Sequence, residues 1–214
     1  MDFIAGELDI EVPSLNFNLL DSFLQNSEEA YKNSKSYRDE IVYHERNQRP
    51  YPWKRRVLES QGTVLHNYRN LDLFKPIVNL IDSFPIAPFT RVILLISQSN
   101  QPDYDFNYHF DRDDTYGFRI CFGLDTSKTF LELAELKTEF RTHGENLGKI
   151  ENYMVKGPIY SIRPMKSNTV MCLPGKKYPH RVPVNNSGAR CVLIVRGNLI
   201  SLDGINFLQK VKNQ

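Results

Sequence analysis

Several features are scarce in this chain of 214 residues, and each absence excludes a class of protein. Long hydrophobic runs are missing: the apolar run at 92–96 is far shorter than the roughly 20 residues that cross a bilayer. Charge is nearly balanced, since 27 basic and 25 acidic side chains leave a net charge of +2, which argues against nucleic-acid binding by bulk attraction. Residues 1–7 lack the basic and apolar regions of a secretory signal, so we expect none.

Cysteine is also scarce. Cys121, Cys172 and Cys191 are odd in number, widely spaced and each set in an apolar stretch, which predicts small buried side chains and not disulfides or zinc ligands. Such cysteines indicate a reducing compartment, and we expect a cytoplasmic location. Core material is plentiful, because 41% of the residues are hydrophobic and 12% aromatic. A chain of this length and composition predicts a globular protein with one structural domain overall.

The N-terminal region of the chain is predicted to be helical. Apolar residues fall at helical spacing over 16–35 and again over 73–84, where Pro85 ends the second helix. Between these helices, 43–56 is predicted to be irregular because prolines bracket a basic stretch. We therefore expect 1–88 to form a helical extension that packs on the rest of the protein.

After residue 88 the hydrophobic pattern changes to that of short strands separated by turn formers. The predicted strands are 90–97, 104–111, 118–124, 129–136, 159–162, 169–173, 180–184 and 190–199. They predict a mainly β fold with flanking helices (α+β), specifically a double-stranded β-helix, or cupin-like jelly roll, over 89–200. The long connection 137–158 is predicted to cross the barrel mouth, and 201–214 to form a C-terminal helix (204–212) and tail.

The segment His109-Phe110-Asp111 carries the most informative chemistry. Side chains two residues apart on a strand project from the same face, so His109 and Asp111 are predicted to point together. An imidazole and a carboxylate can hold two neighbouring positions on a metal, and His180 is the candidate for the third. Two histidines and one carboxylate form the facial triad of non-haem Fe(II) oxygenases, which leaves three positions open.

A cation at a fixed offset supports this interpretation. Oxygenases of this class need a positive side chain to bind the far carboxylate of a dicarboxylate co-substrate, on the strand that returns beside the third ligand. Arg190 follows His180 by ten residues, across an Asn-Asn-Ser-Gly turn that favours a hairpin. Arg196 would share the face of Arg190 and is the alternative anchor.

Residues 89–200 resemble the 2-oxoglutarate- and Fe(II)-dependent dioxygenases, and more narrowly their aspartyl/asparaginyl β-hydroxylase-like branch. Four segments carry the resemblance: 90–95, 109–111, 118–124 and 168–195.

The resemblance implies that His109, Asp111 and His180 bind Fe(II) and that Arg190 pairs with the distal carboxylate of 2-oxoglutarate. Arg119 stands where the branch often has a second basic residue near the co-substrate, whereas Cys121 stands where the family frequently has histidine.

The implied activity is that of a hydroxylase. The resemblance suggests that 2-oxoglutarate and O2 are consumed at Fe(II), that succinate and CO2 are released, and that a C–H bond of the substrate is hydroxylated. The favoured substrate is an amino acid or an amino-acid side chain, free or peptidyl, while a lipid-like molecule and a nucleobase stay open as alternatives. No membrane partner is expected, and nucleic acid is a less favoured partner.

Other interpretations of the same residues stay open. Asp113 shares the face of Asp111 and can replace it as ligand, and a site of this composition also holds catalytic zinc in other proteins. A different class of function is a non-catalytic jelly-roll protein for binding or sensing, in which the basic loop 46–56 grips nucleic acid or another protein. The structural alternative for that loop is a solvated segment.

Overall fold

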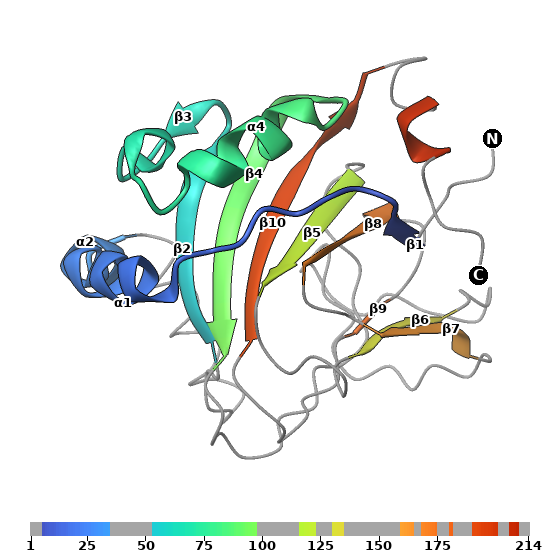
Figure 1. Ribbon diagram of the computed structural model, residues 1–214, viewed down its shortest axis with the longest axis horizontal. Coiled ribbons are helices and arrows are strands. Elements are labelled where there is room, and N and C mark those ends of the chain that lie inside the picture. The colour runs from blue at the N-terminus through green and yellow to red at the C-terminus, as the bar shows by residue number, and fades with distance from the viewer. Residues whose placement is uncertain are drawn as a thin grey trace, which may run out of the picture.

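The computed structural model describes residues 6–34, 53–97, 116–122, 130–134, 159–164, 168–174, 180–181, 190–200 and 206–209. Its helices are α1 (Phe17–Asn26), α2 (Glu28–Lys32), the 3-10 helix η1 (Tyr68–Asn70) and α4 (Lys75–Ser83). Its strands are β1 (Gly6–Leu8), β2 (Trp53–Ser60), β3 (Thr63–Val64), β4 (Ile86–Ser97), β5 (Tyr116–Phe122), β6 (Phe130–Ala134), β7 (Ile159–Pro164), β8 (Thr169–Pro174), β9 (His180–Arg181) and β10 (Arg190–Leu199). Figure 1 shows their arrangement.

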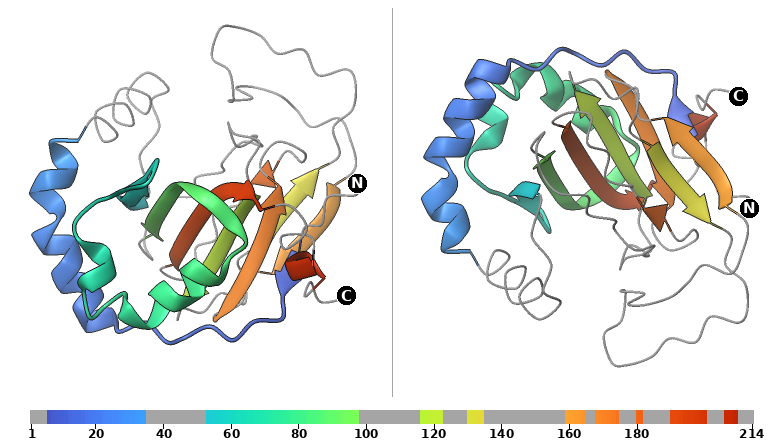
Figure 2. Two further views of the ribbon diagram at one scale, coloured as in Figure 1. Left: turned by 90° about the horizontal axis from the view of Figure 1, so that it is seen from above. Right: turned by 90° about the horizontal axis from the view of Figure 1, so that it is seen from below.

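The described strands form two antiparallel sheets. The larger sheet has seven strands in the order β1-β8-β5-β10-β4-β2-β3, and the smaller has three in the order β7-β6-β9. Strand β10 lies at the centre of the larger sheet, where Ile194 is opposite Ile93 of β4 on one side and Arg119 of β5 on the other. Figure 2 shows the two sheets from above and below. The predicted mainly β fold with flanking helices is therefore confirmed.

The two faces of the larger sheet differ because side chains alternate along each strand. On β5, Phe118 and Ile120 belong to the main hydrophobic core, together with buried residues of α1 and α4. We call this the helix face. The next residue, Cys121, packs on the opposite face with Met171, Ile194 and their neighbours in a second, smaller cluster. We call that opposite side the inner face.

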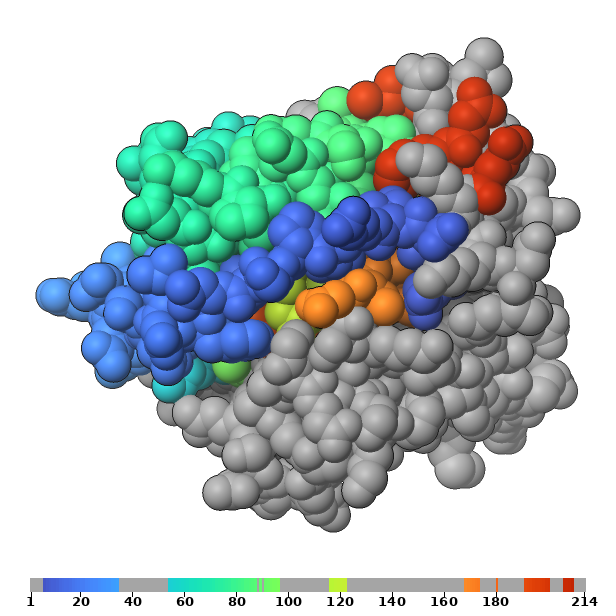
Figure 3. Space-filling view, viewed as in Figure 1, coloured from blue at the N-terminus to red at the C-terminus, as the bar shows by residue number. Residues whose placement is uncertain are grey.

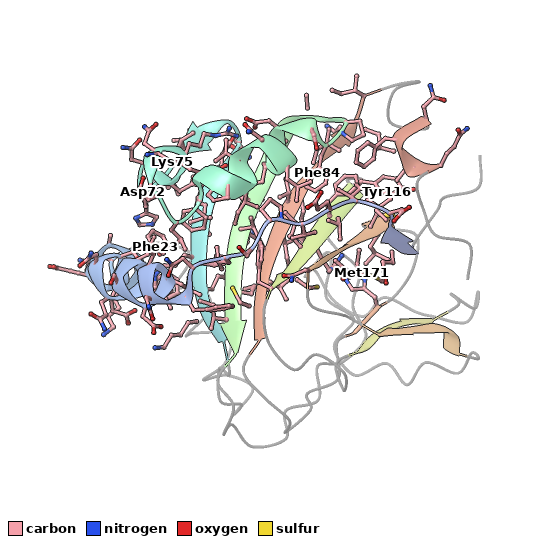
Figure 4. The ribbon with its side chains drawn as sticks, viewed as in Figure 1. Phe23, Asp72, Lys75, Phe84, Tyr116 and Met171 are labelled. Carbon is pink, nitrogen blue, oxygen red and sulfur yellow. The ribbon has the colours of Figure 1, made fainter. Side chains whose placement is uncertain are left out.

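Helix α4 covers the helix face, as the spacing of its apolar residues predicts. Ile77 and Ile81 are fully buried, and the helix begins at Lys75 with proline in its first turn, where proline leaves no extra hydrogen bond unmade. Phe84 ends the helix and stacks on Phe118 of β5, with ring centroids 4.4 Å apart. Figure 4 labels Phe84 below this helix.

The predicted helix over 16–35 is two helices, α1 and α2, that meet at Ser27. The Asn16 side chain caps α1 by accepting hydrogen bonds from the backbone N–H groups of Asn18 and Leu19. The Ser27 hydroxyl donates to the carbonyl oxygen of Phe23 at 2.7 Å. Such local hydroxyl bonds compete with regular helix geometry, which accounts for the break at this position.

The segment before α1 crosses the helix face as an extended strap. It starts from β1, which pairs with β8, and Val12 and Leu15 are buried along its path. In Figure 3 this segment, in blue, runs between the green region that contains α4 and the orange of β8. The strap closes the hydrophobic core on the side that α4 leaves open.

The prediction of an irregular 43–56 is wrong for residues 53–56, which form the first half of β2 and pair with β4. The prolines that suggested irregularity precede the strand, where proline is tolerated. The N-terminal 88 residues therefore contribute strands β1, β2 and β3 to the larger sheet, in addition to their helices. The predicted strand 104–111 and the connection 137–158 lie outside the described residues.

The C-terminal segment is described only over 206–209, where 206–208 are helical and Leu208 joins the main core. Among the residues that the structure describes, no helix has the length and apolar character needed to span a bilayer.

Arg56 ties α1 and α2 to the edge of the larger sheet. Its side chain is 1% exposed and forms an ion pair with Glu28. Its Nε donates to Ser27 Oγ at 2.8 Å, and its Nη2 donates to the carbonyl oxygen of Leu24 at 3.0 Å. The guanidinium carbon lies 4.4 Å from the centroid of the Tyr31 ring, a cation–π distance. Arg56 is therefore part of the fold and is not available in a solvated binding loop.

We expect Arg56→Met to lower the free energy of unfolding by about 2–4 kcal/mol, because several buried hydrogen bonds are lost while most of the packing volume is kept. Urea unfolding followed by circular dichroism measures this change. Lys54→Met is the matched control, since Lys54 is an exposed residue of the same strand, and we expect it to stay within about 0.5 kcal/mol of the parent. Equal effects of the two substitutions would contradict the anchoring role.

Candidate functional site

Arginines of four neighbouring strands occupy the inner face. Arg91 of β4 is opposite Arg196 of β10, which is in turn opposite Gly117 of β5. Arg119 follows on β5, opposite Ile194, and Arg55 of β2 is opposite Leu95, which packs on the inner-face cluster. Residues that are opposite one another on neighbouring strands share a face of the sheet. These four arginines therefore line the inner face.

The best-defined contact of the candidate site joins the two sheets. Arg119 of β5 and His180 of β9 are 4% and 1% exposed, and Arg119 Nη2 lies 3.1 Å from His180 Nε2. A guanidinium can only donate hydrogen bonds, so the imidazole nitrogen is the acceptor. This assigns the lone pair of a neutral ring to Nε2 and its proton to Nδ1. Met171, the register partner of Arg119 on β8, is labelled in Figure 4.

Gly117 brings Arg119 and Arg196 close together. A methyl group at Gly117 would lie 3.4 Å from Arg119 Nη1 and 3.8 Å from Arg196 Cγ. Both side chains therefore lie over the glycine, and a larger residue there would crowd them. Neighbouring side chains therefore form a continuous row from β9 to β4, made of His180, Arg119, Arg196 and Arg91.

The arginines of the inner face act on one another electrostatically. Burial, followed by the neighbouring charges of Arg91 and Arg196, lowers the pKa of Arg55 to about 10. At neutral pH Arg55 still carries its positive charge. The charges of Arg91 and Arg196 are therefore close enough to Arg55 to disfavour its charged form.

A cavity of about 250 Å³ lies beside this row, at the β2 edge of the sheet. Arg91, Ser60 and Val57 line it from the sheet, and Tyr31 and His66 line it from the surrounding helix and turn. His66 lies half-buried in the turn before η1. Burial, followed by the charge of Arg56, lowers its pKa.

Two of the site residues predicted from the sequence, Arg119 and His180, are in contact. Arg190 is the first residue of β10 and its backbone pairs with Ser97, but its side chain lies outside the described residues. His109 and Asp111, and the alternative ligand Asp113, lie outside them as well. Arg196 occupies the inner face beside Arg119.

The described donor fits a ferrous ion in chemical type. An imidazole is a common ligand of iron and of other first-row metals, and Nε2 of the buried His180 is the atom in contact with Arg119. The other two predicted ligands lie beyond the described residues, so the fit concerns His180 alone.

Sequence reasoning missed Arg55 and Arg91 as inner-face residues. Arg55 had been assigned to a loop and Arg91 had been given no role. The signal that predicts strand β2 is an alternation of side chains, in which Arg55 and Val57 alternate with Arg56 and Leu58. This two-residue period is typical of a strand.

The three cysteines of the chain are free and buried, which confirms their prediction as packing residues. Burial raises the pKa of Cys172 to about 11 and that of Cys191 to about 12. Cys121 packs in the inner-face cluster opposite Val192. The thiols of Cys172 and Cys191 remain protonated at neutral pH, which makes them poor nucleophiles and poor metal ligands.

We expect the native protein at pH 8 to react slowly with Ellman's reagent, because pKa values near 11 and 12 leave Cys172 and Cys191 almost entirely as buried thiols. In denaturing urea all three cysteines should react rapidly. The absorbance of the released thionitrobenzoate measures both rates. Rapid labelling of one thiol in the native protein would contradict the assignment of all three to the core.

Comparisons with known proteins give little further information. No protein-family model and no curated protein match the sequence. Among solved structures, the chain is similar to E. coli ycfD, with 13% sequence identity and a TM-score of 0.41 over 71% of this chain. The match spans 43% of the length of ycfD. A similarity at this level supports no statement about activity.

Proposed function

We propose that the protein is an Fe(II)- and 2-oxoglutarate-dependent dioxygenase with a jelly-roll core, which hydroxylates an amino acid or an amino-acid side chain. The observation that carries the proposal is the contact between Arg119 and His180. The two residues are 61 positions apart in the sequence. The resemblance implied a separate role for each, with Arg119 near the co-substrate and His180 as a metal ligand. Their meeting between two antiparallel sheets supports a common site.

The inner face suits a dicarboxylate co-substrate. Arg119, Arg196 and Arg91 form a row of cations that begins at His180, and Arg190 is the proposed anchor for the distal carboxylate. A guanidinium keeps its charge at all physiological pH values and binds a carboxylate through two parallel hydrogen bonds. The partial burial of this face strengthens such contacts relative to those in bulk water.

In this proposal His109, Asp111 and His180 would hold the Fe(II), which supplies the redox chemistry with O2. The overall reaction converts substrate C–H, 2-oxoglutarate and O2 into substrate C–OH, succinate and CO2. The protein's own side chains bind the co-substrate, orient the substrate and exclude water. We place the protein in the cytoplasm, where its three buried thiols stay reduced.

The alternative of a basic binding loop receives less support. Arg55 and Arg56 belong to strand β2, and Arg56 is buried against α1 and α2. Arg55 and Arg56 therefore do not belong to a loop, and the proposed basic loop 46–56 has two fewer cations for binding. Catalytic zinc at the same ligands remains a distinct outcome of the experiments that follow.

We expect the anaerobic protein with Fe(II) to develop a visible charge-transfer band when 2-oxoglutarate is added. His109→Ala and Asp111→Ala should abolish the band and the slow release of succinate that such oxygenases show without prime substrate, because each change removes a proposed ligand. Anaerobic absorption spectroscopy and succinate analysis measure these effects.

His66→Ala is the matched control for this experiment, since it removes a histidine that packs edge-on against Phe23 of α1. It should keep the band. An unchanged spectrum in the parent protein would reject the dioxygenase, and activity that depends on zinc alone would reassign the metal.

We expect Arg190→Met to weaken 2-oxoglutarate binding by about 10- to 100-fold, since a charge-assisted hydrogen bond contributes about 1.5–3 kcal/mol. Arg190→Lys should recover part of this loss by restoring the charge without the planar fork. Titration of the charge-transfer band with 2-oxoglutarate gives the dissociation constants. A large loss in Arg196→Met with little change in Arg190→Met would move the anchor to Arg196.

A further inference from the structure

The cavity at the β2 edge of the larger sheet lies apart from the contact between Arg119 and His180. Its sheet residues belong to β2 and β4, whereas Arg119 belongs to β5, and β10 lies between β5 and β4. The volume of the cavity is about 250 Å³. A cavity of about 150 Å³ holds benzene, so this one has room for a body of that size with a polar group attached.

The walls of this cavity are apolar on several sides and carry a positive charge. Ala30 of α2, Val57 of β2 and Leu65 of the following turn supply the apolar surface. Arg91 of β4 supplies the charge, and none of the described lining residues is acidic. This combination favours a small molecule that has an apolar body and a negative group.

Arg91 has the chemistry to bind a carboxylate. A guanidinium carries several N–H donors in a planar fork, so it can bind a carboxylate while keeping its other contacts. Ser60, which is opposite Arg91 in the pairing of β2 with β4, brings a hydroxyl to the same cavity. Burial, followed by the charge of Arg91, lowers the pKa of Arg55 to about 10, and a carboxylate bound to Arg91 would offset this repulsion.

His66 is held in the wall of the cavity by an unusual turn. Its backbone has a φ of 56°, in the left-handed region that residues with a side chain seldom adopt, and its ring packs edge-on against Phe23 with centroids 6.0 Å apart. Burial, followed by the charge of Arg56, lowers the pKa of His66, so the ring is neutral at pH 7 and one nitrogen donates. Neither Ser60 Oγ nor the His66 ring forms a hydrogen bond with any residue that the structure describes.

We propose that this cavity binds a small monocarboxylate with an apolar body about the size of a benzene ring. In this site the carboxylate pairs with Arg91 and accepts hydrogen bonds from Ser60 and His66, while the apolar body lies against Val57 and Leu65. The inference does not rest on the proposed function, because none of the described lining residues is a proposed metal ligand or co-substrate anchor.

Benzoate is the probe for the first test, with benzamide and inorganic phosphate as controls. Benzamide keeps the ring without the charge, and phosphate keeps a negative charge without the ring. NMR titration of the full-length protein without metal or 2-oxoglutarate gives the three dissociation constants, and benzoate should shift the ring signals of His66. We expect benzoate to bind about tenfold more tightly than either control, because only benzoate makes both the charged and the apolar contacts.

Three outcomes of this titration would overturn the proposal. Equal binding of benzamide would show that the site does not recognise a carboxylate. Equal binding of phosphate would show that the apolar walls contribute nothing. Benzoate that leaves the His66 signals unmoved would show that the cavity is not occupied.

A pair of substitutions at Ala30 tests the charge of the ligand without changing the buried walls. Ala30 lines the cavity and is exposed on α2, and both Glu and Lys are good helix formers, so each variant should fold. We expect Ala30→Glu to weaken benzoate binding about fivefold or more by repulsion, and Ala30→Lys to bind at least as tightly as the parent. Equal affinities of the two variants would overturn the pairing of the ligand with a cation.

Arg91→Met should weaken benzoate binding about tenfold, since it removes the charged partner. Lys54→Met is the matched control, because it removes an exposed cation of β2 that does not line the cavity. Equal losses in the two variants would reduce the effect to long-range attraction and overturn the site. Circular dichroism checks that both variants fold, and the Ala30 pair decides the question if Arg91→Met does not.

A final titration separates this site from the proposed oxygenase centre. In anaerobic protein with Fe(II), whose charge-transfer band reports bound 2-oxoglutarate, benzoate should bind with unchanged affinity and leave the band in place. Displacement of 2-oxoglutarate by benzoate would overturn the separate site. Protein that binds benzoate as expected but develops no band rejects the proposed function and leaves the carboxylate site standing.

Discussion

The alternation of side chains across β5 and β10 is the constraint on which the rest of the structure depends. Phe118 and Ile120 face α4 and the N-terminal strap, whereas Arg119 and Cys121 face the other way. A shift of one residue in the register would exchange these two sets, placing a guanidinium in the main core and a phenyl ring against His180. The apolar burial that stabilises the sheet on its helix face therefore also determines which side chains line the inner face.

Arginine has two opposite uses in this protein. Arg56 faces the helices, where an ion pair, hydrogen bonds and an aromatic ring compensate its burial. Its neighbour Arg55 faces the inner side, near Arg91 and Arg196, and burial together with these like charges lowers its pKa. The first arrangement stabilises the fold. The second brings like charges together on the inner face.

Much of the fold was predictable because its signals are local. The strand predicted at 190–199 coincides with β10, and the helix predicted at 73–84 contains α4. The sequence analysis missed strand β2 because it interpreted 43–56 from its prolines. The strand-like alternation of Arg55 and Val57 with Arg56 and Leu58 follows directly after those prolines. The length of β2 depends on its pairing with β4, which no local pattern reveals.

The sequence by itself determined the kinds of element and the kinds of chemistry available, because hydrophobic period, proline position and side-chain type act over a few residues. It identified His180 and Arg119 as candidates without placing one beside the other. Their contact spans 61 residues and joins strands of two sheets, so it follows from the register of β5 and the position of β9. Only the tertiary structure decided that the guanidinium of Arg119 meets the lone pair of His180, because long-range pairing and packing bring these strands together.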